Sequence, residues 1–287
     1  MQAILRSTRT TLEMIKWEHS IFALPFALTG AFLAARGLPA LRALLWIVIC
    51  MVTARSAAMA FNRLADADLD RDNPRTAMRA LPAGLLSRGF VGGFTVLMCV
   101  GFVIGAAMLN RLALTLSPVA LAVVLGYSYM KRITRWSHVV LGLALGIAPS
   151  AAWIAVRGSL DWRVVVLTCA VLLWVAGFDV LYACQDFEHD RKVGLNSIPQ
   201  ALGLNGAFWV ARIMHAGMLA LLVWIAFLFG LGLIAKLGII VVGGLLFYEH
   251  SIISPQDLRR MNAAFFTLNG IISMLYFISV ATDLIVN

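Results

Sequence analysis

The chain carries little charge: 13% of its 287 residues are Asp, Glu, Lys or Arg, whereas 61% are hydrophobic. Soluble domains carry about 25% charged residues, so this composition excludes an ordinary soluble protein and indicates a membrane protein. The net charge of +9 does not come from a basic soluble domain, because Lys and Arg are spread over short segments between apolar runs. We therefore expect no nucleic-acid partner.

Cysteine and histidine are also scarce. The cysteines lie in apolar runs without the paired spacing of metal ligands, which predicts buried thiols and argues against disulfides or a zinc site. The histidines show no common ligand spacing either, so the predicted site leaves them out. These residues are Cys50, Cys99, Cys169 and Cys184, and His19, His138, His189, His215 and His250.

What the chain does have is long apolar runs, each near the roughly 20 residues that a helix needs to span a membrane. They lie at about 20–37, 41–62, 89–109, 112–130, 137–156, 163–185, 207–230, 232–249 and 263–283. We predict a single all-α domain, 1–287, that forms a polytopic membrane bundle of about nine transmembrane helices. The division between the seventh and eighth runs rests on Gly230, Gly232 and Lys236, so eight or ten spans are also compatible with the sequence.

Lys and Arg gather at the N-terminus and after every second apolar run. Because short cytoplasmic loops are enriched in these residues, we expect the segments at about 63–88 and 186–206 to be cytoplasmic active-site loops. A cleavable signal is not expected, since the first run contains Pro25 and is followed by further runs. The simplest location is a bacterial plasma membrane.

Two aspartate pairs stand at the cytoplasmic ends of apolar runs. Asp66 and Asp70 form the first pair, and Asp186 and Asp190 form the second, about 120 residues later. Carboxylates spaced i and i+4 share a helix face, and two such faces pointing at each other require a cation between them. Mg²⁺ prefers oxygen ligands completed by phosphate, so the pattern predicts a magnesium and diphosphate site.

Each pair continues a polar stripe that begins inside the membrane. At about 100° per residue, Arg55 and Asn62 fall on the face of the first pair, and Asp179 and Tyr182 on the face of the second. Ionisable groups at membrane depth are costly unless they serve a cavity or a partner, so Arg55 and Asp179 are candidate functional residues. The alternative is that these two residues simply pair with each other, and that the aspartates are ordinary solvated helix ends.

The same angular spacing turns Asp68 and Glu188 away from the two stripes. We expect both side chains to be solvated bystanders.

Two basic segments accompany the carboxylates on the same side of the membrane. Arg75 and Arg79 follow the first pair in a proline-punctuated loop, and Tyr127 and Lys131 end the fourth run. Guanidinium groups fork onto phosphate oxygens, so these residues can supply the cationic half of a diphosphate site.

Together these residues resemble the UbiA family of intramembrane prenyltransferases. The resemblance rests on Asn-x-x-x-Asp-x-x-x-Asp at 62–70, Arg-Thr-x-x-Arg at 75–79, Tyr-x-x-x-Lys at 127–131, and Asp-x-x-x-Asp at 186–190 preceded by Tyr182. One departure is Arg63, where many members have a third aspartate. The stretch Lys16–Phe26 is similar to a bacterial branch labelled 4-hydroxybenzoate polyprenyltransferase, some members of which act in menaquinone synthesis.

The resemblance implies an aromatic prenyltransferase that moves a polyprenyl group from its diphosphate to a ring carbon of 4-hydroxybenzoate in ubiquinone synthesis. The alternative acceptor is 1,4-dihydroxy-6-naphthoate or another aromatic of the menaquinone pathway. The implied cofactor is Mg²⁺, bound by Asp66, Asp70, Asp186 and Asp190, with the diphosphate on Asn62, Arg75, Arg79, Tyr127 and Lys131. Arg55, Asp179 and Tyr182 would bind the aromatic acid.

Two rival classes remain at this stage. A cation-coupled transporter would also use charges at membrane depth, but it leaves the Arg-Thr-x-x-Arg loop unexplained. A lipid head-group transferase would require an Asp-x-x-Asp-Gly spacing that the aspartate segments lack. The lipid bilayer is an expected partner in every case, and the sequence leaves the oligomeric state open.

Overall fold

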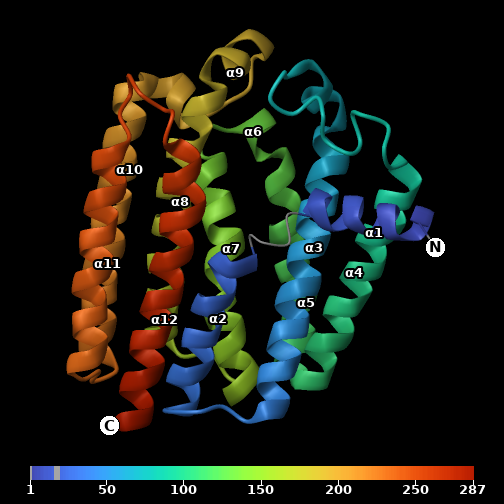
Figure 1. The fold of residues 1–287 in the computed structure, drawn as a ribbon. Helices are drawn as coiled ribbons and strands as arrows, with labels where there is room; N and C mark the ends of the chain where they lie inside the picture. The colour runs from blue at the N-terminus through green and yellow to red at the C-terminus, as the bar shows by residue number, and fades with distance from the viewer. Residues whose placement is uncertain (1, 16–19) are drawn as a thin grey trace.

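The computed structural model describes residues 2–15 and 20–287, and within these ranges the chain is helical, with a single isolated bridge between Ser254 and Asp257 (Figure 1). Part of the stretch that resembles the bacterial branch, residues 16–19, lies outside the described ranges. The elements are α1 Gln2–Ile15, α2 Ser20–Ala35, α3 Leu41–Asp72, α4 Arg88–Leu109, α5 Arg111–Gly126, η2 Tyr127–Tyr129, α6 Met130–Ile133, α7 Ser137–Arg157, α8 Trp162–Ala183, η3 Cys184–Asp186, α9 Phe187–Val193, α10 Ile198–Leu228, α11 Leu233–Ile252, the π-helical η4 Ala263–Leu268 and α12 Asn269–Val286.

The prediction of an all-α membrane bundle is confirmed. Among the described residues, eight helices are long and apolar enough to cross a membrane, and the apolar part of α2, Ala23–Ala35, is shorter. The predicted number of about nine spans therefore corresponds to eight long helices and one short one.

The helix α8 forms the centre of the bundle. A helix that is apolar on all sides belongs in a core, and 72% of the most apolar stretch of α8 is buried. The fully buried Trp174 packs its ring 5.0 Å from the rings of both Phe26 and Phe178. On α7, Gly142 permits close approach to α8, because a Cβ atom there would lie 2.5 Å from the carbonyl oxygen of Leu172.

The division between the seventh and eighth runs occurs where the glycines predicted it. The helix α10 ends at Leu228, Gly230 adopts a φ of 64°, and α11 begins at Leu233. The buried carboxylate of Asp283 accepts hydrogen bonds from the backbone nitrogens of Gly232 (2.6 Å) and Ala235 (3.3 Å). The start of α11 is thus capped by a side chain from α12.

The segment 186–206 is more ordered than the expected loop, since it contains α9 and the first turns of α10. The side chain of Ser197 accepts a hydrogen bond from the backbone nitrogen of Gln200 (3.3 Å), and Pro199 occupies the first turn of the helix. Both are ordinary helix-start signals. Gly203, with a φ of 71°, then kinks α10 and separates this start from the apolar run.

The predicted site segments meet at one end of the bundle. The loop 73–87, α6 and α9 lie together at the end drawn uppermost, where α3 and α8 also finish, and α1 crosses the outside of α3 (Figure 1).

Candidate active site

A polar chamber of about 730 Å³ opens at this end of the bundle. All twelve residues predicted for the site line it, although they come from four separate segments of the chain, 55–70, 75–79, 127–131 and 179–190. They are Arg55, Asn62, Asp66, Asp70, Arg75, Arg79, Tyr127, Lys131, Asp179, Tyr182, Asp186 and Asp190.

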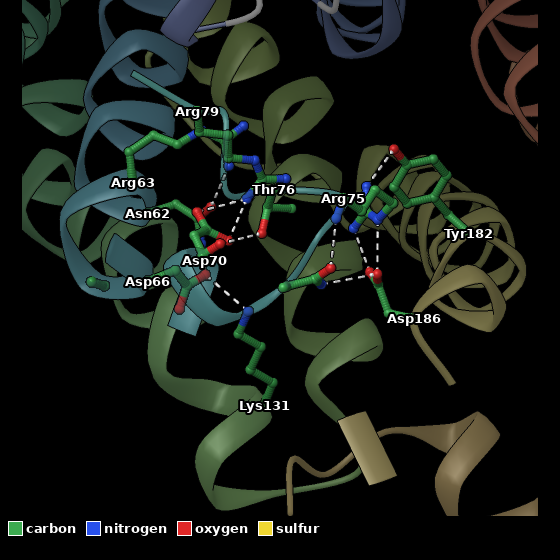
Figure 2. Close-up of polar contacts among 12 residues, drawn as sticks. Asn62, Arg63, Asp66, Asp70, Arg75, Thr76, Arg79, Lys131, Tyr182 and Asp186 are labelled. Carbon is green, nitrogen blue, oxygen red and sulfur yellow. Dashed lines mark hydrogen bonds and ion pairs between the residues drawn. The ribbon is translucent and has the colours of Figure 1, made fainter. Parts of the chain in front are cut away.

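The first aspartate pair lies on the continuous helix α3, so its two carboxylates share a face as the spacing predicts. Asp66 is 2% exposed and contacts Lys131, whose Nζ is 2.9 Å from Oδ2. The amide of Asn62 donates a hydrogen bond to the same oxygen (3.0 Å), and Arg132 lies 3.2 Å from Oδ1. Asp66 is thus neutralised by two cations, Lys131 and Arg132, and Figure 2 shows the contact with Lys131.

Asp70 has its own cation. One nitrogen of Arg79, Nη1, donates to both carboxylate oxygens at 2.7 and 2.8 Å. The hydroxyl of Thr76 donates to the backbone carbonyl of Asp70 (3.0 Å), which ties the loop to the end of α3. The first cluster is therefore buried and fully paired (Figure 2).

The second pair is built differently. Asp186 ends the 3₁₀ turn η3, and Asp190 lies in the next element, α9. Arg75 forks onto Asp186: Nε donates to Oδ1 at 2.7 Å, and Nη2 donates to Oδ2. Asp190 has no hydrogen-bonded or ion-paired side chain in the described part of the chain.

Arg75 links the loop to α8 and η3. Its Nη1 donates to the hydroxyl of Tyr182 (3.2 Å), and the guanidinium lies 5.4 Å from the centre of that ring (Figure 2). Burial alone would lower the pKa of Arg75, but its hydrogen bonds to Asp186 and the charge of that carboxylate outweigh burial and raise the pKa. Arg75 therefore stays a cation at every physiological pH.

The deep end of the chamber is formed by Arg55 and Tyr127. The Nε atom of Arg55 is buried and has no hydrogen-bond partner in the described structure. An unpaired donor on a buried cation is costly, which suits a group that awaits an anionic ligand. Arg55 and Tyr127 also line a second, apolar cavity of about 330 Å³ that lies among α3, α4, α5 and α7.

Arg55 and Asp179 do not pair with each other, so the alternative interpretation of these two charges is not what the structure shows. Instead, Oδ2 of Asp179 lies 2.7 Å from Nδ1 of His138, the second residue of α7. Asp68 and Glu188 are exposed, as expected, and Asp68 forms ion pairs with the surface residues Arg71 and Arg88.

The donors of the chamber suit a magnesium ion that is shared with phosphate. Four carboxylates line one cavity, and oxygen is the ligand that Mg²⁺ prefers. In the described part of the chain, no three His, Cys, Asp or Glu side chains already lie close enough to share a metal ion. The carboxylates therefore fit an ion completed by a substrate, in which phosphate oxygens supply the remaining ligands, better than a closed protein cage.

Five further polar residues of the site were not among the predicted ones. Arg132 follows Lys131 directly, and nothing in the sequence distinguished it from the other basic residues of the loops. Asn73 ends α3 before Pro74, and its amide donates a hydrogen bond to Asp186 (3.3 Å). The remaining members, Arg63, Thr76 and His138, line the chamber. His138 had no sequence signal, because its partner is 41 residues away.

Comparison with known proteins gives one consistent result. The model of the family described as "UbiA prenyltransferase family" matches residues 23–271. The chain is 32% identical over 255 residues to a 4-hydroxybenzoate octaprenyltransferase of Photobacterium profundum, which covers 88% of each chain. It is 30% identical over 259 residues to the enzyme of the same name from Aliivibrio fischeri, with 90% and 89% covered.

Solved structures agree. A UbiA homologue from Aeropyrum pernix, in its apo form, superposes with a TM-score of 0.85 at 35% identity and covers 93% of this chain and 98% of that one. A UbiA homologue from Archaeoglobus fulgidus bound to GPP and Mg²⁺ has a TM-score of 0.70 at 18% identity, with 95% and 99% covered. At that identity the second structure shows a shared fold alone.

Proposed function

The chain belongs to the UbiA prenyltransferase family, and from this premise we propose that it transfers a polyprenyl group from polyprenyl diphosphate to a ring carbon of 4-hydroxybenzoate. The observation that carries the proposal is one chamber in which two carboxylate pairs and three cations converge with the buried Arg55, whose Nε has no hydrogen-bond partner in the described part of the chain. The names of the bacterial relatives support the aromatic acceptor, and a role in ubiquinone synthesis follows from that acceptor.

Asp66, Asp70, Asp186 and Asp190 would hold Mg²⁺ in this chamber. The ion would supply positive charge against the oxygens of the departing diphosphate. Before substrate binds, three of these carboxylates are paired with cations: Asp66 with Lys131, Asp70 with Arg79, and Asp186 with Arg75. We infer that these three cations exchange their carboxylate partners for phosphate oxygens when the diphosphate enters. Mg²⁺ then takes over the carboxylates, and the negative diphosphate takes over the cations.

The acceptor is bound at the deep end. Arg55 takes its carboxylate, because this guanidinium is buried and Nε lacks a partner. The aromatic ring then lies between Arg55 and the diphosphate, with its hydroxyl toward Asp179 and Tyr182. This placement presents a ring carbon beside the phenol to C1 of the prenyl group, which becomes electron-deficient as its bond to the diphosphate oxygen breaks.

The apolar cavity next to Arg55 receives the first part of the prenyl tail and keeps water from the developing cation. Ala106, which is 3% exposed, lines this cavity, whereas its neighbour Ala107 faces outward. Ala106→Phe should fill the cavity and lower kcat/KM for the diphosphate by about tenfold or more, whereas Ala107→Phe should leave it within about twofold. Equal kinetics for the two variants would place the tail elsewhere.

We place the protein in a bacterial plasma membrane with the chamber at the cytoplasmic face. This orientation is supported by the concentration of Lys and Arg in the loops at the chamber end.

The test of the proposed function is product formation by the purified protein in lipid. A polyprenyl diphosphate is offered with Mg²⁺ and either 4-hydroxybenzoate or 1,4-dihydroxy-6-naphthoate. We expect prenylated 4-hydroxybenzoate, and we expect Arg55→Ala to raise the KM of the acceptor more than that of the diphosphate. Product with the naphthoate alone would refute the assigned acceptor, and no product with either would refute the aromatic reaction.

A further inference from the structure

His138 is buried in the wall of the chamber, outside the family motifs that the sequence displays. It belongs to the first turn of α7, it is 4% exposed, and its ring joins three helices. On one side Nδ1 lies 2.7 Å from Oδ2 of Asp179 in α8. On the other side Nε2 accepts a hydrogen bond from the backbone nitrogen of Ile198, the first residue of α10 (3.4 Å).

These two contacts determine where the proton of the ring lies. A backbone nitrogen can only donate, so Nε2 must carry a lone pair rather than a hydrogen. In the neutral ring the hydrogen is then on Nδ1, where it is donated to Asp179. The start of α10 thus selects the tautomer that makes His138 a fixed hydrogen-bond donor to a carboxylate.

Asp179, like Asp190, has no Lys or Arg partner among the described side chains, but it differs from the other carboxylates of the chamber because a histidine ring holds one of its oxygens. Its side chain is 24% exposed and lines the chamber, and Oδ1 makes no hydrogen bond with a described residue. Asp179 lies on α8 about two helical turns before Asp186, which belongs to η3, and it lines the same chamber as Arg55 and Tyr127. Asp179 therefore lies deeper in the bundle than the diphosphate-binding residues, at the depth that we assign to the acceptor.

We propose that His138 is a positioning residue that holds Asp179 with one oxygen fixed and the other free to accept the phenolic proton of the aromatic acceptor. The inference rests on the proposed function and adds the residue that prepares the acceptor for attack. Removal of the proton raises the electron density at the ring carbon beside the hydroxyl, which is the carbon that forms the new bond.

The prenyl transfer conserves bonds and protons. The bond between prenyl C1 and oxygen breaks, and its electron pair leaves on the diphosphate. The ring carbon forms the new carbon–carbon bond to C1 while the phenolic proton moves to Oδ1 of Asp179, which gives a neutral dienone. The ring carbon then loses its hydrogen to a diphosphate oxygen, and the dienone oxygen takes the proton back from Asp179, so the ring is aromatic again.

Two substitutions separate this positioning role from a purely structural one. In His138→Asn the amide nitrogen takes the place of Nδ1 and keeps the donor toward Asp179, but the acceptor for Ile198 is lost. In His138→Gln the amide oxygen takes the place of Nε2 and keeps that acceptor, but the donor toward Asp179 is lost. Each variant thus retains one of the two hydrogen bonds.

We expect His138→Gln to lower kcat for 4-hydroxybenzoate by on the order of 10–100-fold, with the KM of the diphosphate within about twofold of wild type. His138→Asn should retain kcat within about threefold. In an Asp179→Asn background, His138→Gln should cause no further loss, because the two residues act as one unit. Thermal unfolding of each purified variant verifies that the protein is folded.

Equal losses in the Asn and Gln variants, or a larger loss in the Asn variant, would overturn the assignment and leave His138 as a cap for α10. An additive loss in the double variant, or a rise in the KM of the diphosphate equal to the fall in kcat, would overturn it as well. If the wild-type protein prenylates no aromatic acceptor, the proposed function fails too. If it does so and His138→Gln is normal, only the present inference fails.

Discussion

The two aspartate pairs have the same spacing in the sequence but different structures. The pair on α3 stands on one unbroken helix, both residues are buried, and each carboxylate is paired with a cation. The second pair is divided between η3 and α9, and only Asp186 is paired, while Asp190 has no partner side chain in the described part of the chain. The first pair thus forms a half of the site in which every carboxylate is neutralised, and the second pair forms a half in which one carboxylate is unpaired.

This difference indicates how one chamber can be stable without a ligand and still bind one. Four unpaired carboxylates in one cavity would repel each other strongly, and the ion pairs of Asp66, Asp70 and Asp186 with Lys131, Arg132, Arg79 and Arg75 reduce that repulsion. The unpaired Asp190 leaves one negative charge in place to attract a divalent ion.

The largest effect is expected when either half loses a carboxylate. Asp66→Asn and Asp186→Asn should each lower kcat/KM by about 10³-fold or more, because both halves are needed to bind the metal and diphosphate. Steady-state kinetics in lipid measures this. A residual rate above about one tenth of wild type in one variant would show that its half of the chamber is dispensable.

A smaller effect is expected from exchanging arginine for lysine, and it should differ between the two halves. Arg75 uses two nitrogens on the two oxygens of Asp186, whereas Arg79 reaches Asp70 through one nitrogen only. Lysine keeps the charge but cannot fork, so Arg75→Lys should lower kcat/KM by about tenfold or more and Arg79→Lys by only a few-fold. The reverse order would contradict the geometry of the two clusters.

The halves should also differ in stability without substrate. Asp70→Asn leaves the half-buried Arg79 without its partner and should destabilise the fold by about 1–3 kcal/mol. Asp190→Asn removes a carboxylate that has no partner and should leave the protein as stable as wild type or slightly more stable. Unfolding in detergent without divalent ions checks this, and an equal fall in Tm for both variants would remove the distinction.

The smallest effects are expected outside the two polar stripes. Asp68→Asn and Glu188→Gln alter exposed carboxylates that do not line the chamber, so kcat/KM should stay within about twofold. These variants are the matched controls for Asp66→Asn and Asp186→Asn. A loss at Asp68 as large as that at Asp66 would contradict the assignment of helix faces.

Helical periodicity could predict the first cluster because α3 stays regular from Arg55 to Asp70. The same arithmetic placed Tyr182, Asp186 and Asp190 in the chamber, but it could not foresee the 3₁₀ turn η3, which puts Asp186 in a different element from Asp190. Ser197 and Pro199 are local signals for the start of α10. The polar composition of the segment 186–206 nevertheless led to the prediction of a loop.

The pairings within the chamber could not be predicted, because each depends on how helices pack. A sequence shows that Arg55 and Asp179 are expensive at membrane depth, but it does not show whether they meet. In the structure Asp179 finds His138 from α7, and Arg55 stays open to the chamber. Likewise Lys131 reaches Asp66 only because η2 and α6 turn the end of α5 toward α3.

The most direct test of the shared site is a calorimetric titration of the lipid-embedded protein with an unreactive prenyl thiodiphosphate, with and without Mg²⁺. We expect binding that requires Mg²⁺ in the wild type and that is lost in both Asp66→Asn and Asp186→Asn. Binding of equal strength without Mg²⁺, or a loss confined to one of the two variants, would contradict a single metal and diphosphate site built from both aspartate pairs.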